Sequence, residues 1–127
     1  MRLLLDTNAL LWWFQDDHAL SARARRSIAS IDNQIVVSTA VGWEISIKSN
    51  SRKLEASGLL DDLEGKLLEE GMVTLPISMD HAVRAGKLPG YHKDPFDRML
   101  VAQAQAENLS VISSDAIFER YGVKRIW

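Results

Sequence analysis

Four acidic residues stand where the hydrophobic pattern of the chain predicts the end of a strand or the start of a helix. They are Asp6 in LLLDTN, Glu44 in VGWEIS, Asp97 in DPFDRMLVAQA and Asp115 in VISSD. A carboxylate inside or beside an apolar segment is energetically expensive unless another group compensates its charge. A hard divalent cation such as Mg²⁺ or Mn²⁺ suits converging carboxylates, because it prefers oxygen ligands. The four residues therefore indicate a metal site of the kind that assists phosphodiester chemistry.

Each of the four acids also has an ordinary structural explanation. Asp6 could cap a helix, and Glu44 could be a surface residue of a helix. Asp97 could face Asp94 in a capping box, and Asp115 could be a first-turn acid behind a serine cap. What these explanations leave unexplained is the coincidence of four separate acids at the same end of the expected sheet.

Strand and helix patterns alternate along the chain. Apolar runs predict strands at 1–5, 34–37, 72–77, 109–112 and 123–126, and helices at 9–15, 21–31, from 38 or 39 onward, 57–71, 78–87, 95–107 and 114–121. Alternation of this kind is typical of an α/β domain with a mainly parallel sheet and helices on both faces. Pro76 predicts that the third strand ends there or lies at an edge. Ligands of such sheets bind outside the carboxyl ends of the strands, where Asp6 and Asp115 lie.

The composition of the chain limits the classes of protein to which it can belong. The 127 residues are 46% hydrophobic, which suffices for one core, and no repeat or linker divides residues 1–127. The absence of cysteine excludes disulfides, thiolate zinc sites and cysteine nucleophiles. Without a long apolar stretch or a basic leader, we expect a soluble cytoplasmic protein with no membrane partner. The net charge of −2 argues against nucleic-acid binding, but once four acids are neutralised by metal, 13 acids remain against 15 Lys and Arg.

The ordered strings LLLDTNALLWW, STAVGWEISIK, HKDPFDRMLVAQA and VISSDAIF span nearly the whole chain. Together they resemble PIN-domain ribonucleases, and specifically the toxin of VapBC-type toxin–antitoxin pairs. The resemblance implies a compact α/β/α sandwich and a catalytic, metal-binding quartet at Asp6, Glu44, Asp97 and Asp115. Ser113 matches the small hydroxyl residue near the last acid. Asp94 belongs to the D-P-F-D variant of the motif, which leaves its part in catalysis open.

The resulting hypothesis is a Mg²⁺- or Mn²⁺-dependent endoribonuclease. A metal-activated water would attack phosphorus in line with the leaving oxygen, so that products carry 5′-phosphate and 3′-hydroxyl ends. Asn8 could orient the Asp6 carboxylate through its amide. Lys93 and Arg98 are candidates for contacts with RNA phosphates, although charged residues near a loop are more often simply solvated. His92 is a weak signal that could touch substrate or partner.

Trp12, Trp13 and Phe14 are consecutive large aromatic residues in one expected helix. Neighbouring helix positions are ~100° apart, so one buried stripe cannot hold all three. Either the helix packs from two sides, or some of the rings lie in a protein interface. The family resemblance implies that this helix helps to form the groove for the C-terminal segment of an antitoxin, and that the toxin forms a homodimer.

Three alternatives stay open at this point. An Asp-based phosphotransferase would place a second acid two residues after Asp6, where this chain has Asn8. A receiver-like signalling domain needs an acidic pair after the first strand and an aspartate after the third, where the chain has Leu75 and Pro76. A PIN fold could also keep its acids and act only as an RNA- or protein-binding module.

Overall fold

A parallel sheet with the strand order β3-β2-β1-β4-β5 forms the centre of the molecule. The computed structural model describes residues 1–52 and 54–127. The strands are β1 (Arg2–Leu5), β2 (Gln34–Ser38), β3 (Val73–Leu75), β4 (Ser110–Ile112) and β5 (Arg125–Ile126). Leu3, Leu4 and Leu5 of the central strand are fully buried, as expected for a strand covered on both faces. The predicted α/β class is confirmed.

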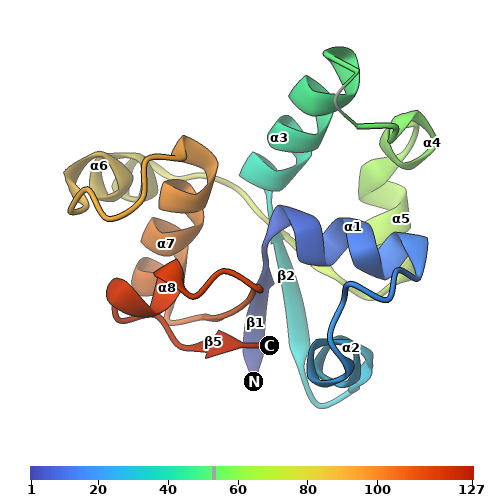
Figure 1. Cartoon of the computed structure of the whole chain (residues 1–127), viewed down its shortest axis with the longest axis horizontal. Coiled ribbons are helices and arrows are strands. Elements are labelled where there is room, and N and C mark those ends of the chain that lie inside the picture. Colours follow the sequence, from blue (N-terminus) through green and yellow to red (C-terminus); the bar gives the residue numbers. More distant parts are fainter. Residues whose placement is uncertain (53) are drawn as a thin grey trace.

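Helices cover both faces of the sheet. They are α1 (Thr7–Gln15), α2 (Ala22–Ala29), α3 (Thr39–Asn50), α4 (Ser57–Leu60), α5 (Leu63–Glu69), α6 (Met79–Lys87), α7 (Pro95–Glu107) and α8 (Ile117–Arg120). In Figure 1, α1 to α5 lie to one side of β1 and β2, and α6 to α8 lie to the other. Right-handed crossovers require this division, because the chain winds outward from β1 to β3 and then returns to β4 and β5 on the opposite side of β1. Within the described residues, no helix combines the length and the apolar character that crossing a bilayer needs.

Most helix starts follow from a short polar side chain that accepts a hydrogen bond from the first turn. Among the described residues these caps are Asp6, Ser21, Ser38, Asp62, Ser78 and Asp94. The sequence pattern predicts Ser21 as the cap of one helix and either Ser38 or Thr39 as the cap of the next, and the structure confirms Ser21 and selects Ser38.

The single helix predicted over 57–71 is wrong. The chain instead forms α4 and α5, separated by Asp61 and Asp62. The Asp62 carboxylate accepts a hydrogen bond from the Gly65 amide at 3.2 Å, so this side chain starts a new helix instead of continuing the old one. The strand predicted over 72–77 is also shorter, ending at Leu75 just before Pro76, and β3 lies at the sheet edge as Pro76 predicted.

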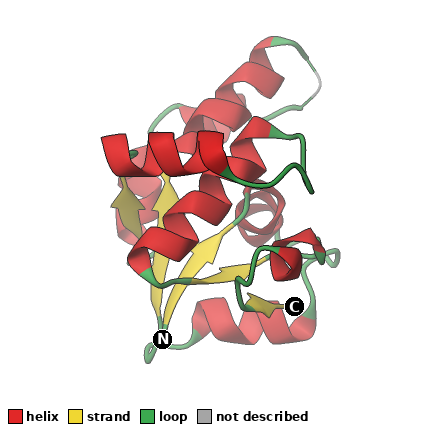
Figure 2. Cartoon of the chain, turned by 90° about the vertical axis from the view of Figure 1, so that its left-hand side faces the viewer, coloured by secondary structure: helices red, strands yellow, loops and turns green. Residues whose placement is uncertain are grey.

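The neighbouring strands β1 and β4 determine where a ligand crevice lies at one end of the sheet. Leu5 pairs with Ile112, so both strands end at the same level. The chain leaves β1 into α1 on one face and leaves β4 toward α8 on the other (Figures 1 and 2). This divergence opens a crevice at the carboxyl ends, which is the usual ligand position in a parallel sheet.

Candidate active site

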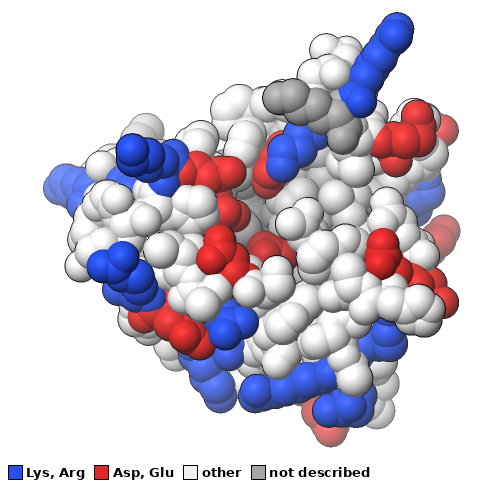
Figure 3. All heavy atoms as spheres, in the orientation of Figure 1, with Lys and Arg blue, Asp and Glu red and all other residues white. Residues whose placement is uncertain are grey.

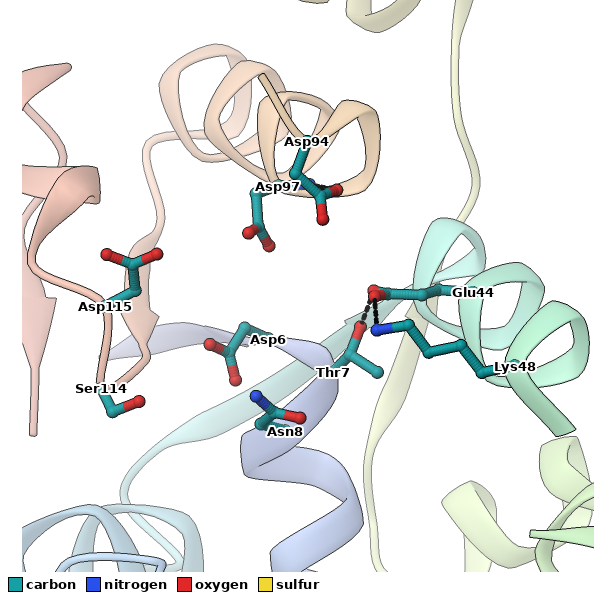
Figure 4. Close-up of a pocket in the computed structure, with 9 residues that line it drawn as sticks. All are labelled: Asp6, Thr7, Asn8, Glu44, Lys48, Asp94, Asp97, Ser114 and Asp115. Carbon is teal, nitrogen blue, oxygen red and sulfur yellow. Dashed lines mark hydrogen bonds and ion pairs between the residues drawn. The ribbon is translucent and has the colours of Figure 1, made fainter. Parts of the chain in front are cut away.

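An acidic pocket of about 140 Å³ occupies this crevice. In Figure 3 the acidic side chains gather around a hollow near the centre of the face. The lining comes from four segments of the chain and consists of Asp6, Thr7, Asn8, Glu44, Lys48, Asp94, Asp97, Ser114 and Asp115. All four sequence-predicted acids are therefore brought together, and Asp94 joins them (Figure 4).

Three of the acids hold the backbone with one oxygen while lining the pocket. Asp6 Oδ1 accepts from the Ala9 amide at 2.8 Å, and Asp94 Oδ1 accepts from the Phe96 amide at 2.8 Å. Asp115 Oδ1 accepts from the Ile117 amide at 3.0 Å. Asp6 and Asp94 are thus confirmed as helix caps, whereas Asp115 lies before the Ala116 cap of α8 and is not a first-turn acid behind a serine cap. A carboxylate that accepts one such bond still has a second oxygen that can face the pocket.

Asp97 has a different role from the one that a capping box would give it. Asp94 supplies the cap and also accepts from the Asp97 amide at 3.2 Å, which leaves the Asp97 side chain free to enter the pocket. Its Oδ2 lies 2.8 Å from His92 Nε2, and Asp115 Oδ2 lies 3.5 Å from the same nitrogen.

The backbone fixes the proton of His92. The Asp94 amide donates to His92 Nδ1 at 3.2 Å, so a neutral ring carries its proton on Nε2. This N–H faces Asp97 and Asp115, although without regular hydrogen-bond geometry. In this arrangement the neutral His92 ring points its N–H toward the two carboxylates and has no lone pair to offer a cation, even though the three groups lie within 4.8 Å of one another.

Glu44 is bonded through both oxygens to the chain itself. The Thr7 hydroxyl donates to Oε1, and Lys48 Nζ lies 2.5 Å from Oε2 (Figure 4). The Glu44 side chain is 7% exposed and that of Lys48 is 44% exposed, so the pair joins a buried acid to an ammonium at the pocket surface. Glu44 lines the pocket with both oxygens already paired, and its predicted part in metal binding stays a prediction.

Burial, more than the crowding of acids, shifts the pKa of two of them upward. Burial raises the pKa of Asp6, and the charges of Glu44 and Asp115 act in the same direction. Burial, followed by repulsion from Asp94, raises the pKa of Asp97 to about 6. Both shifts disfavour the ionised forms of these two carboxyls, chiefly because burial removes water from the charge.

The pocket chemistry fits a hard divalent cation. Its acidic lining offers carboxylate oxygens, and Asp6 and Asp115 each use Oδ1 for a backbone amide, so that Oδ2 is the oxygen that each can offer a cation. A cation there would stabilise the ionised forms of Asp6 and Asp97, whose pKa values are raised in its absence. Asp6, Asp97 and Asp115 are the residues available to hold it, with Asp94 beside them.

Several other predicted site residues take different positions. Asn8 lines the pocket, but within the described chain it makes no hydrogen bond to Asp6, which the Ala9 amide orients instead. Ser113 is fully buried below the pocket, where its hydroxyl accepts from the Asp115 amide at 3.0 Å, and Ser114 provides the lining.

Arg98 is not available as a phosphate contact. Its guanidinium donates at 2.9 to 3.2 Å to four backbone carbonyl oxygens, those of Ala85, Leu88, Pro89 and His92. The side chain therefore ties the end of α6 and the following loop to the start of α7. Lys93 is exposed and outside the pocket lining.

The aromatic residues of α1 are all partly buried against the core. The ring of Trp12 lies 5.8 Å from that of Trp127. Phe14 instead lines a mainly apolar groove of about 280 Å³ between α1 and the start of α4, with Leu11, Gln15, Glu55, Ala56, Gly58 and Leu59. Packing from two sides thus accounts for Trp12, while Phe14 reaches an accessible groove.

Sequence reasoning undervalued His92 and missed Lys48 and Thr7. His92 stands two residues before Asp94, which is the short spacing of a loop that folds back on a helix cap. Lys48 follows Glu44 by four residues, the spacing of an ion pair on one helix face. Both signals are local and readable. The contact between Thr7 and Glu44 joins positions 37 residues apart and leaves no local sign.

Comparison with known proteins adds a family and a set of similar folds. The family model for the PIN domain matches residues 3–124. No curated protein matches the chain. Among solved structures, VapBC2 of Rickettsia felis bound to a promoter DNA fragment has a TM-score of 0.71 and 17% identity, covering 98% of this chain and 97% of that one.

Two further structures are similar over most of their length. A toxin–antitoxin complex from Klebsiella pneumoniae has a TM-score of 0.62 and 21% identity, covering 89% of this chain and 86% of that one. VapC20 of Mycobacterium tuberculosis, a toxin that cleaves the sarcin–ricin loop, has a TM-score of 0.71 and 15% identity, covering 95% of each chain. At such identities the likeness establishes the fold.

Proposed function

The chain belongs to the PIN-domain family, and from this premise we propose that it is a divalent-metal-dependent endoribonuclease, the toxin of a toxin–antitoxin pair. The observation that carries the proposal is the pocket at the carboxyl ends of β1 and β4, where five carboxylates from separate segments converge around a single lysine among the described residues. VapC20, which has the same fold, is an RNA-cleaving toxin.

Each residue of the pocket has a role in this proposal. Asp6, Asp97 and Asp115 would hold Mg²⁺ or Mn²⁺, with Glu44 beside them, and His92 faces Asp97 and Asp115 from the side. When bound, the cation supplies positive charge for the phosphate and activates water for attack on phosphorus. Hydrolysis forms the bond from the water oxygen to phosphorus and breaks the bond from phosphorus to the 3′ oxygen, which takes up a proton. The products then carry 5′-phosphate and 3′-hydroxyl ends.

The test is cleavage of single-stranded RNA by the purified protein in Mg²⁺ or Mn²⁺ and in EDTA. We expect cleavage only with metal, products with 5′-phosphate ends, and loss of cleavage in Asp6→Asn and Asp115→Asn. Asp32→Asn is the matched control, because Asp32 is exposed in the turn before β2, at the other end of the sheet. A wild type that binds RNA but never cuts it would support the non-catalytic binding module instead.

The phosphotransferase and receiver alternatives are not favoured. The position two residues after Asp6 is Asn8, and β3 ends at Leu75 without an aspartate. The pocket acids instead come from β1, β4, α3 and α7, which is a convergence that neither class requires.

The second half of the proposal is an antitoxin partner that covers the α1 groove. The Klebsiella pneumoniae structure is a toxin–antitoxin complex, and VapBC2 was solved on promoter DNA. In this chain the groove beside Phe14 is mainly apolar and open, which suits an apolar anchor on a partner segment. Co-expression with the adjacent small reading frame, followed by co-purification, tests this partner.

We also propose that the protein acts in the cytoplasm, where its RNA substrate lies, and that it forms a homodimer. The observation that favours self-association is a run of exposed apolar side chains at the start of α6. Ile77, Met79 and Val83 are 37%, 79% and 48% exposed. Light scattering of the wild type and of Met79→Glu tests the dimer, since a charge in an apolar interface should favour the monomer.

A further inference from the structure

Lys48 is the single basic side chain that lines the acidic pocket within the described chain. Five carboxylates share this lining, and a phosphodiester brings another negative charge. A single divalent cation offsets two charges, so a bound phosphate still faces an excess of negative charge. The basic residues expected to help are unavailable, because Arg98 is bonded to four carbonyl oxygens and Lys93 lies outside the lining.

The ammonium of Lys48 is held by one hydrogen bond and still has donors available for another partner. It makes one hydrogen bond among the described residues, to Glu44 Oε2, and an ammonium carries three donors. Glu44 is 5% exposed and is fixed on its other oxygen by Thr7, so the anchor is rigid. The Lys48 side chain is 44% exposed on the pocket side (Figure 4). The hydrogen bond to Glu44 raises the pKa of Lys48, with Asp94 and Asp97 acting in the same direction, so the group stays charged.

We propose that Lys48 is the phosphate-binding residue of this site, held in place by Glu44 and donating to a non-bridging oxygen of the RNA phosphate that enters the pocket. This inference rests on the proposed ribonuclease function. It assigns Glu44 the task of positioning the lysine, while the carboxylates of Asp6, Asp97 and Asp115 remain with the cation.

A purely structural lysine would behave differently. If Lys48 only compensated the buried Glu44, its loss would lower stability without changing how RNA binding responds to salt. A phosphate-binding lysine has a specific signature, because its removal from a single-stranded complex reduces the slope of log affinity against log salt by ~0.7.

The experiment measures binding of a labelled single-stranded RNA of mixed sequence by fluorescence anisotropy at several salt concentrations. The wild type, Lys48→Met, Lys48→Arg and Lys124→Met are compared in Ca²⁺, with cleavage followed separately in Mg²⁺. Lys124 is the matched control, because it is an exposed lysine just before β5, at the other end of that strand from the pocket. Lys48→Met should weaken binding about tenfold and reduce the salt slope by ~0.7, raising KM more than it lowers kcat. Lys48→Arg should keep the slope, and so should Lys124→Met.

Unchanged affinity and slope in Lys48→Met would overturn the inference while leaving the ribonuclease proposal standing. If Lys48→Met does not fold, the double variant Glu44→Gln/Lys48→Met carries the test, because it leaves no uncompensated buried charge. It should show the same reduced slope, and a slope equal to that of Glu44→Gln alone would refute the phosphate contact. A wild type that neither binds nor cuts RNA would remove the proposed function, and this inference with it.

Discussion

Replacing Asp97 with asparagine should stabilise the metal-free protein. Asparagine keeps the shape of the side chain and removes the charge that burial and Asp94 make costly. A carboxyl whose folded pKa lies above its unfolded pKa destabilises the fold when it is ionised. That cost is absent below about pH 3.8, grows as the pH rises, and is complete above about 6. The wild type therefore loses stability over this interval, and Asp97→Asn should lack that loss.

The size of the effect follows from the shift. A displacement from 3.8 to about 6 corresponds to a ceiling of about 3 kcal/mol at 1.36 kcal/mol per pH unit. The side chain is 24% exposed, so screening by solvent reduces the expected gain to roughly 1–2 kcal/mol. Metal should reverse the order, because a cation held by the wild type at 100 times its Kd adds about 2.7 kcal/mol. The variant has lost one ligand and should gain less.

The assay is urea unfolding of the wild type, Asp97→Asn and the exposed control Asp32→Asn. Each is measured in EDTA at pH 7.5 and 4.5, and in Mn²⁺ at pH 7.5. We expect Asp97→Asn to be the most stable in EDTA at pH 7.5, an advantage that shrinks at pH 4.5, and the wild type to be the most stable in Mn²⁺. Asp97→Asn unfolding more easily than the wild type in EDTA at pH 7.5 would refute the reasoning, because the carboxylate would then be stabilising without metal.

Three further predictions test other parts of the molecule. Expression of the wild type without a partner should arrest growth, and Asp115→Asn should relieve the arrest at equal protein level; equal toxicity of the two would remove Asp115 from the reaction. Phe14→Ser should weaken antitoxin binding by ~1 kcal/mol or more in a titration, while Trp12→Ser should chiefly lower the melting temperature, since Trp12 packs against Trp127. Arg98→Met should lower the free energy of unfolding by ~2 kcal/mol or more in urea, because carbonyls bonded to a charged donor lose their partner; unchanged stability with weaker RNA binding would restore Arg98 as a phosphate contact.

The sequence predicted the frame of the molecule better than its side-chain contacts. Alternating patterns sufficed for the strands and for most helices, and the end of β1 located Asp6 because an apolar run cannot continue through an acid. The break between α4 and α5 escaped prediction, because the leucine spacing continues through Asp61 and Asp62 while the cap acts locally against it.

The roles of charged side chains were harder to predict than their positions. Arg98 was a candidate for a phosphate contact as a charged residue near a loop, yet its guanidinium reaches back to carbonyls as far as 13 residues away. Glu44 was expected as a ligand because it belongs to the set of four acids that the family resemblance singles out, and this resemblance gives no sign of the partners that hold its two oxygens. Its engagement by Thr7 is a tertiary contact, which no helical periodicity encodes.

Asp6, Asp94 and Asp115 each have both a structural and a pocket-facing oxygen, and this affects how descendants of such a protein would lose activity. Each of these carboxylates starts a helix or turn with one oxygen and faces the pocket with the other. A lineage released from selection for cleavage would still be selected to keep short polar caps at these positions. Aspartate-to-asparagine drift would inactivate the site and spare the fold, whereas drift to alanine would damage both. An intact set of acids in a relative is therefore weak evidence that the relative is catalytic. An Asn at one of these positions is stronger evidence that catalysis has been lost.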